Sequence, residues 1–104
     1  MFPEILKENA QIEVLNGSQT EGKAGKAASR LRRLGFHVID IDNYNTENDK
    51  PVFRTFIKNL KPGKNLKTIE VLQKLYDITD VREIPIEEVD ESSLSDVQLI
   101  LGVN

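Results

Sequence analysis

The sequence contains no cysteine, a single histidine and no long apolar run. The absence of cysteine excludes disulfides, thiolate catalysis and zinc sites built on cysteine, and it leaves the redox compartment open because a chain without thiols suits either setting. No stretch approaches the roughly 20 apolar residues that cross a bilayer, so no membrane span is expected. No signal peptide opens the sequence, which indicates either a cytoplasmic protein or a domain excised from a longer exported one.

An excess of positive charge is also lacking. The 14 Lys and Arg residues against 17 Asp and Glu residues give a formal net charge of -3. General nucleic-acid binders are usually basic, so nucleic acid is not an expected partner. Hydrophobic residues make up 38% and charged residues 30% of the 104 positions, the balance of a soluble globular chain. We expect one domain over residues 11–104, preceded by a lead-in over residues 1–10.

What the sequence does contain is a clear succession of strand and helix patterns. Alternating Ile12 and Val14 predict a strand that ends at Asn16-Gly17, two residues that tolerate the left-handed backbone of a turn. A helical stripe of alanines and leucines follows and ends at Gly35. The last apolar run is typical of a central strand. The expected elements are strands over residues 11–15, 36–42, 52–57, 81–84 and 97–101 and helices over residues 22–34 and 64–76.

This order of elements favours an α+β fold. We predict a two-layer ferredoxin-like (βαββαβ) sandwich with one extra short strand before the last strand. A small three-layer parallel sheet is the alternative. Two helices cover only one face of a sheet, which favours the two-layer arrangement.

Patterns that would indicate catalysis are weak. Gly17 to Lys23 has the spacing of a phosphate-binding loop, but Ala24 stands where a Ser or Thr would hold magnesium. His37, the only histidine, has no second ligand at metal spacing. No nucleophile elbow is present, so a hydrolytic triad is unsupported. We therefore expect no enzyme activity, no cofactor and no metal site, and we interpret the acidic segment 87–96 as a solvated loop.

Two surface features are candidates for binding. Lys23, Lys26, Arg30 and Arg33 recur three or four residues apart and form a basic stripe on the first predicted helix. A solvated helix face opposite the alanines accounts for such a stripe by itself. The alternative is a ridge that attracts an anionic polymer.

Phe53 and Phe56 supply the second feature, because they fall on opposite sides of the third predicted strand. One of them is expected on the sheet face that the helices leave open. An exposed aromatic residue there is a common place for a partner to dock.

Several motifs recur together at fixed offsets. They are Val14-Leu15-Asn16-Gly17, Gly22-x-Ala24, Leu34-Gly35-Phe36 and the closing Ile100-Leu101-Gly102. From about residue 8 onward this combination resembles the C-terminal domain of the LytR-CpsA-Psr family of cell-envelope proteins. Lys23 departs from the pattern, because an apolar residue usually stands between the glycine and the alanine.

The resemblance implies a non-catalytic, extracytoplasmic binding or interaction module in envelope biogenesis. In that family the domain usually follows a membrane anchor and a separate catalytic domain, so the chain is expected to be a segment of a membrane-anchored protein. The implied partner is a cell-wall polymer or an envelope protein, and no catalytic residue carries over. A cytoplasmic small-molecule-sensing regulatory domain of ferredoxin-like fold is the alternative.

Overall fold

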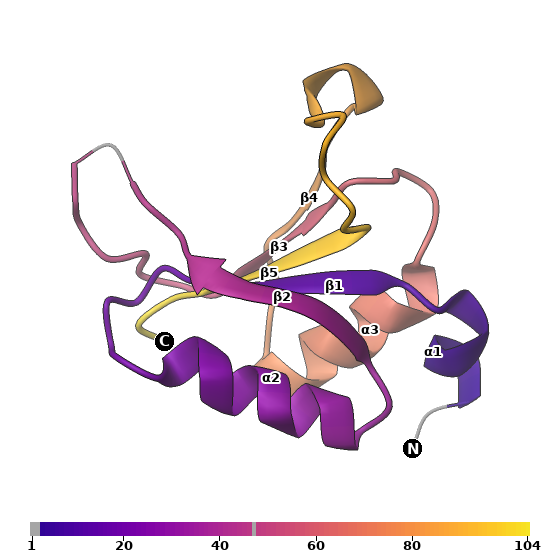
Figure 1. The fold of residues 1–104 in the computed structure, drawn as a ribbon, viewed down its shortest axis with the longest axis horizontal. Coiled ribbons are helices and arrows are strands. Elements are labelled where there is room, and N and C mark those ends of the chain that lie inside the picture. Colours follow the sequence, from indigo (N-terminus) through magenta and orange to yellow (C-terminus); the bar gives the residue numbers. More distant parts are fainter. Residues whose placement is uncertain (1–2, 47) are drawn as a thin grey trace.

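The computed structural model describes residues 3–46 and 48–104, which form a mixed α+β domain with one five-stranded sheet and three α-helices. Figure 1 shows the helices below the sheet and the segment that leads into the last strand above it. The α+β class is thereby confirmed. The elements in chain order are α1 (Pro3–Glu8), β1 (Gln11–Asn16), α2 (Lys23–Arg33), β2 (His37–Asn43), β3 (Phe56–Asn59), α3 (Leu66–Tyr76), β4 (Val81–Glu83), the 3-10 turn η1 (Ile86–Glu88) and β5 (Val97–Leu101).

The strand order differs from the ferredoxin-like order predicted from the sequence. The sheet runs β2-β1-β5-β3-β4, and only β3 and β5 pair antiparallel; β1 pairs parallel with both β2 and β5. A split β-α-β sandwich needs a third strand between the two strands that a helix connects. Here α2 returns the chain to the position directly beside β1. The long-range pairing of β1 with β5 then completes the centre of the sheet.

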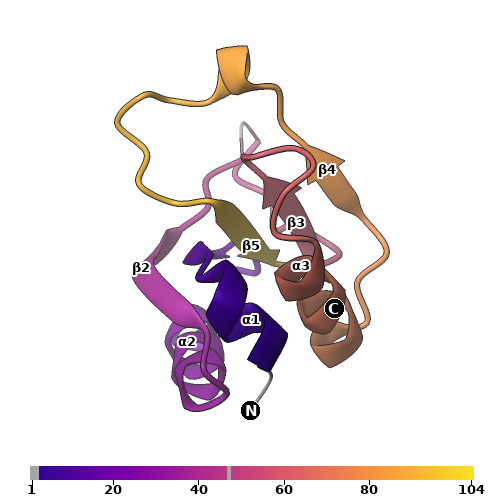
Figure 2. The same ribbon diagram turned by 90° about the vertical axis from the view of Figure 1, so that its right-hand side faces the viewer.

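The helices cover one face of the sheet, as expected (Figures 1 and 2). Side chains alternate along a strand, so alternate residues of the central strands point to the helical layer. The main core lies there, and its fully buried members include Ile12, Val14, Leu31, Leu72 and Leu99. The central position predicted for β5 is correct.

The opposite sheet face carries a smaller hydrophobic cluster. The third strand, which contributes to it, differs from the prediction. The strand begins at Phe56 and not at residue 52. Phe56 is buried against Leu15 and Ile100, with Tyr44 packed on it at a ring-centroid distance of 6.0 Å. Phe53 lies outside the strand and is 65% exposed. The aromatic residue on the face away from the helices is therefore covered by a loop, and the exposed aromatic residue lies in a loop.

Residues 52–55 fail to continue the strand because their backbone groups bind elsewhere. The Val52 N–H donates to Gly17 O at 2.7 Å, and Val52 O accepts the Val103 N–H at 2.8 Å. The Thr55 N–H and the Thr55 hydroxyl donate to Asn104 O at 3.1 and 2.9 Å. This stretch therefore joins the end of β1 to the segment after β5.

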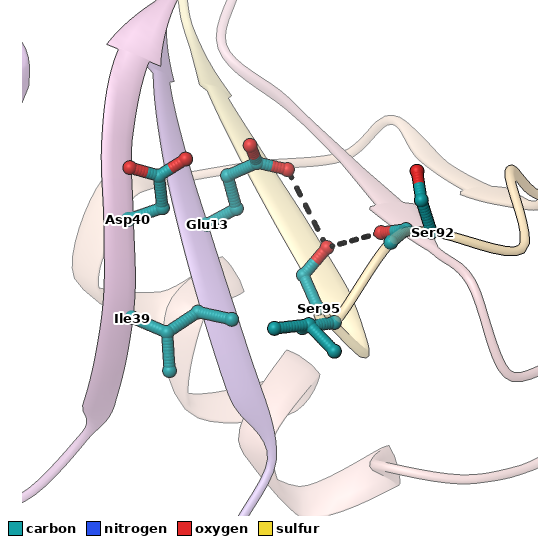
Figure 3. A pocket seen from close by; sticks show the side chains of 7 residues that line it. Glu13, Ile39, Asp40, Ser92 and Ser95 are labelled. Carbon is teal, nitrogen blue, oxygen red and sulfur yellow. Dashed lines mark hydrogen bonds between the residues drawn. The ribbon is translucent and has the colours of Figure 1, made fainter.

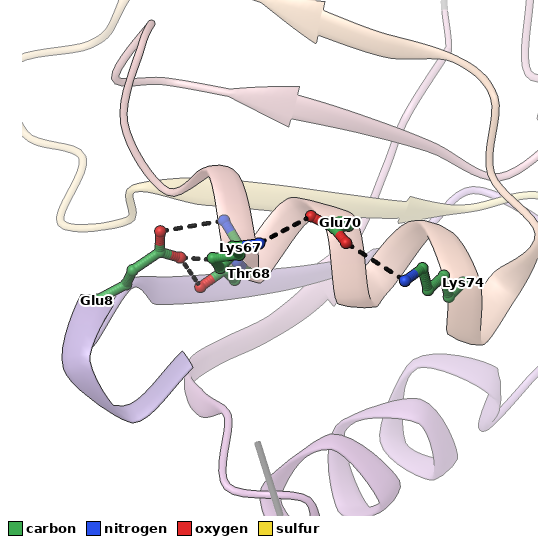
Figure 4. Close-up of polar contacts among 5 residues, drawn as sticks. All are labelled: Glu8, Lys67, Thr68, Glu70 and Lys74. Atoms are coloured by element: carbon green, nitrogen blue, oxygen red, sulfur yellow. Dashed lines mark hydrogen bonds and ion pairs between the residues drawn. The ribbon is translucent and has the colours of Figure 1, made fainter. Parts of the chain in front are cut away.

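The N-terminal helix α1 packs on α3. Ile5 is buried in the main core. Glu8 accepts hydrogen bonds from the Lys67 N–H at 3.0 Å and from the Thr68 N–H at 2.7 Å, and the Thr68 hydroxyl donates to the same carboxylate at 2.6 Å (Figure 4). The first amides of a helix have no partner within it, so Glu8 caps α3 from another element.

Candidate functional site

A groove lies between α2, α3 and the carboxyl end of β5. It is a cavity of about 290 Å³. Three of the four residues of the predicted basic stripe line it. Its walls are Lys23, Lys26, Ala27, Arg30, Thr55, Tyr76, Leu101 and Asn104. We refer to this cavity as the basic groove.

The sequence of α2 explains why its cations are presented together. Ala24, Ala27, Ala28 and Leu31 are buried against the sheet. Small side chains at these positions let the helix lie close to the strands, and the remaining positions face solvent. Lys26 and Arg30 are four residues apart, so their side chains lie on one side of the helix.

The cations of the stripe have different surroundings. Lys23 Nζ donates to Gly102 O at 2.6 Å and to Val103 O at 3.3 Å, so it ties α2 to the end of β5. The side chains of Lys26 and Arg30 form no ion pair with an acidic residue within residues 3–46 and 48–104, and the Arg30 guanidinium lies over the Tyr76 ring at 5.3 Å from its centroid. Arg33 is exposed and does not line the groove. The free positive charge of the groove therefore comes from Lys26 and Arg30.

Tyr76 is the groove residue with an unusual environment. Its hydroxyl oxygen is buried and has no hydrogen-bond partner in the described part of the chain. Burial raises the pKa of this phenol, and the neighbouring Arg30 guanidinium offsets part of that rise. The hydroxyl therefore stays protonated at neutral pH.

A second cavity of about 350 Å³ continues the basic groove. Thr55, Tyr76 and Asn104 line both cavities, so Tyr76 lies where the two meet. The second cavity adds a guanidinium group, hydroxyl groups and carboxylate groups to the first. Its other lining residues are Arg54, Asp77, Thr79 and Asp80.

The turn residues singled out in the sequence lie at the end of β1 and at the two ends of α2. The Asn16 carboxamide oxygen accepts the Ser18 N–H at 3.0 Å and the Ser18 hydroxyl at 2.6 Å, which shapes the turn after β1. Gly22 has φ +81° and precedes α2, and Gly35 has φ +100° and follows it. Both glycines adopt a left-handed backbone that other residues reach with strain.

Gly17 and Gly102 have a different role, because another segment of the backbone packs directly against them. A Cβ at Gly17 would lie 2.6 Å from Val52 Cγ2. A Cβ at Gly102 would lie 2.5 Å from the carbonyl carbon of Arg54. These glycines let residues 52–55 pass directly against the ends of β1 and β5.

The opposite face of the sheet holds a further cavity of about 320 Å³ under the segment that leads into β5 (Figure 3). Glu13 accepts a hydrogen bond from Gln98 Nε2 at 2.8 Å, and Ser95 Oγ lies 3.4 Å from the same carboxylate oxygen. Asp40 lines the cavity, but its carboxylate accepts the Ile41 N–H at 2.9 Å. Among the described residues no group of three or more His, Cys, Asp or Glu side chains is placed to hold a metal ion.

Sequence reasoning did not identify Thr55, Tyr76 or Asn104 as groove residues. Tyr76 follows the apolar spacing of α3, which indicates core packing. Thr55 was predicted within a strand, and the sequence has no signal that brings it beside Asn104.

None of the helices in the described ranges combines the length and apolarity that crossing a bilayer requires.

Comparisons with known proteins give consistent results. The profile of a family described as LytR cell envelope-related transcriptional attenuator (LytR_C) matches residues 9–104. The solution structure of the C-terminal domain of RV0431 is similar, with a TM-score of 0.58 and 25% sequence identity over 88% of this chain and 70% of that chain. No curated protein matches the sequence.

A second solved structure shows the same fold. It is the crystal structure of the soluble domain of a conserved hypothetical secreted protein, an Rv2700 ortholog, from Mycobacterium marinum. Its TM-score is 0.64 at 20% identity, and the match covers 96% of this chain and 62% of that chain.

Proposed function

Since this chain belongs to the LytR C-terminal family of cell-envelope-related proteins, we propose that it is a non-catalytic, extracytoplasmic binding module that contacts an anionic wall polymer or an acidic partner protein of the envelope. The family resemblance stated from the motifs is confirmed by the match over residues 9–104. A similar fold in the soluble domain of a secreted protein supports the location.

The observation that carries the proposal is the pair of free cations in the basic groove. The side chains of Lys26 and Arg30 have no acidic partner in the described part of the chain and line one cavity together with the apolar side chains of Ala27 and Leu101. A cleft with charges of one sign and walls of low polarity concentrates the electric field, so it attracts ions of the opposite sign. An anionic ligand would supply the missing negative charge.

The test is co-sedimentation of the chain with purified peptidoglycan that carries or lacks attached anionic polymer. We expect the wild-type chain to sediment with the polymer-bearing wall and to be released as salt rises, because ions screen charges over about 8 Å at physiological ionic strength. Lys26→Glu with Arg30→Glu should abolish sedimentation.

Arg33→Glu is the matched control, because it reverses a charge on the same helix outside the basic groove. It should retain most of the binding. Equal sedimentation of the groove double variant and the wild type, or no sedimentation of the wild type with either wall, would contradict wall binding through the groove. If Arg33→Glu loses as much binding to the wall as the double variant does, the polymer is attracted to the helix in general and does not bind in the groove.

A further inference from the structure

Of the two edge strands of the sheet, β2 is the longer. It lies at one end of the strand order β2-β1-β5-β3-β4 and pairs only with β1. Its seven residues include Val38, Ile39 and Ile41, which favour a strand. The other edge strand, β4, has three residues. A long edge strand with free backbone groups is a template for pairing with another chain, so β2 is where such pairing is expected.

Two backbone amides of β2 face away from the sheet. Directly after β2, the Tyr44 N–H donates to Asn16 O in β1 at 2.9 Å. Backbone N–H groups alternate between the two sides of a strand, so the N–H groups of Ile41 and Asn43 face the free side. A strand added at this edge would need these two amides as donors.

Both amides are already bound by side chains of β2 itself. The Asp40 carboxylate accepts the Ile41 N–H at 2.9 Å, and the Asp42 carboxylate accepts the Asn43 N–H at 2.8 Å. Each aspartate thus binds the amide of the residue that follows it. A charged acceptor makes a stronger hydrogen bond than a neutral carbonyl does. An incoming strand would have to displace both carboxylates before it could pair.

The first half of the β2 edge is closed in a different way. Arg32 Nη2, which belongs to α2, donates to Val38 O at 3.1 Å. The register with β1 shifts between Val38 and Asp40, so Ile39 is the extra residue of a β-bulge. A bulge bends the strand and interrupts regular pairing. Arg32 and the bulge therefore disfavour strand addition where the two aspartates do not reach.

From these contacts we infer that Arg32, Asp40 and Asp42 close the edge of β2, and that the strand they exclude is β2 of a second copy. Two copies related by a two-fold axis would pair this strand with itself, and one sheet would run through both. The aspartates oppose that pairing because they occupy the amides and because like charges on facing strands repel. The closed edge is independent of the basic groove, since none of the three residues lines it.

The experiment compares the self-association of variants by sedimentation velocity over a series of concentrations, with the β2 amide signals followed by NMR. We expect the wild type to show no association through β2. Asp40→Ala with Asp42→Ala should associate at least about tenfold more tightly, because two amides in each copy become free to pair. Asp40→Asn with Asp42→Asn removes the same charge but keeps an oxygen acceptor at each position. It should therefore associate less tightly than the alanine variant.

Glu87→Ala with Glu91→Ala is the matched control, because it changes the net charge equally at two exposed residues in the segment before β5. It should show no association through β2. Thermal unfolding shows whether each variant keeps the fold. The wild type gives a readout that depends on no variant, since the Ile41 and Asn43 amide signals should have the temperature dependence of hydrogen-bonded groups.

Four outcomes would overturn the inference. The first is an alanine variant at Asp40 and Asp42 that does not associate, and the second is association equal to it by the control at Glu87 and Glu91. The third is equal association of the alanine and asparagine variants, because the hydrogen bonds would then not close the edge. The fourth is solvent-like behaviour of the wild-type amides. All these variants keep the groove cations, so none of these failures would bear on wall binding.

Discussion

Replacement of Gly102 by alanine tests how tightly the chain after β5 is held against residues 52–55. A Cβ at this position would lie 2.5 Å from the carbonyl carbon of Arg54, 2.8 Å from Thr55 N and 2.9 Å from Arg54 Cα. All three atoms belong to the backbone, so no side-chain rotation relieves the overlap. The Gly102 N–H also donates to the Thr55 hydroxyl at 3.0 Å, which fixes the two segments together.

The expected cost follows from these contacts. Overpacking of this kind typically destabilises a protein by about 1–3 kcal/mol. Separation of the two segments would also strain hydrogen bonds such as that from Val103 N to Val52 O, each contributing about 0.5–1.5 kcal/mol. We therefore expect Gly102→Ala to lower the free energy of unfolding by about 2–4 kcal/mol. For a domain of this size the melting temperature falls by roughly 10–25 °C.

Thermal and urea unfolding followed by circular dichroism measure this effect. Gly25→Ala is the matched control, because a Cβ there would meet no atom within 4 Å and the residue lies inside α2. Alanine favours a helix over glycine by about 0.5–1 kcal/mol, so this variant should be slightly more stable than the wild type. Gly17→Ala should cost less than Gly102→Ala, because its closest contact is the Val52 side chain.

A Gly102→Ala variant as stable as the wild type would refute the reasoning, since it would mean that residues 52–55 do not pack against the end of β5. The same variant should also weaken anion binding, because Leu101 precedes Gly102, Asn104 follows it by two residues, and both line the basic groove. Gly25→Ala should leave binding unchanged.

The remaining predictions concern the cap of α3 and the core. Burial by itself raises the pKa of Glu8, but the hydrogen bonds from Thr68 and Lys67 outweigh it and lower the pKa below its ordinary value of 4.5. Glu8→Ala should cost about 0.5–2 kcal/mol at pH 7 in urea unfolding. Because the folded-state pKa is lowered, this stability is present above pH 4.5 and is lost as pH falls below it. The free energies of unfolding of the wild type and Glu8→Ala should therefore converge in acid. A constant difference between them down to pH 2.5 would contradict the capping role of Glu8. Leu72→Ala should cost about 2–5 kcal/mol because Leu72 is fully buried. Leu94→Ser should change stability by less than about 0.5 kcal/mol, since Leu94 is 77% exposed; equal effects of the two substitutions would argue against this core.

Much of the local structure could be predicted from the sequence. The alternation of Ile12 and Val14, the alanine stripe of α2 and the closing apolar run specify elements whose bounds differ by a few residues from those observed. These patterns succeed because backbone period and burial act over neighbouring positions of the chain. The start of β3 was misplaced because residues 52–55 have strand-forming side chains but bind their backbone groups to Gly17 and residues 103–104.

For the candidate site, the sequence revealed the cations but not the groove. The spacing of Lys26 and Arg30 already places them on one side of a helix, and the same spacing includes Arg33, which lies outside the cavity. Tyr76 was indistinguishable from a core residue of α3. Its unsatisfied hydroxyl appears only once α3 lies beside α2 and the end of β5.

The amino-acid sequence by itself determined the α+β class, most of the helices and strands, the family and the charge of α2. Only the tertiary structure decided the strand order β2-β1-β5-β3-β4 and the joining of Lys26, Arg30, Tyr76 and Asn104 in one groove. The physical reason is that propensity and periodicity depend on near neighbours in the chain. Strand order and grooves depend on contacts between residues far apart in sequence, whose energies are realised only when the whole core packs.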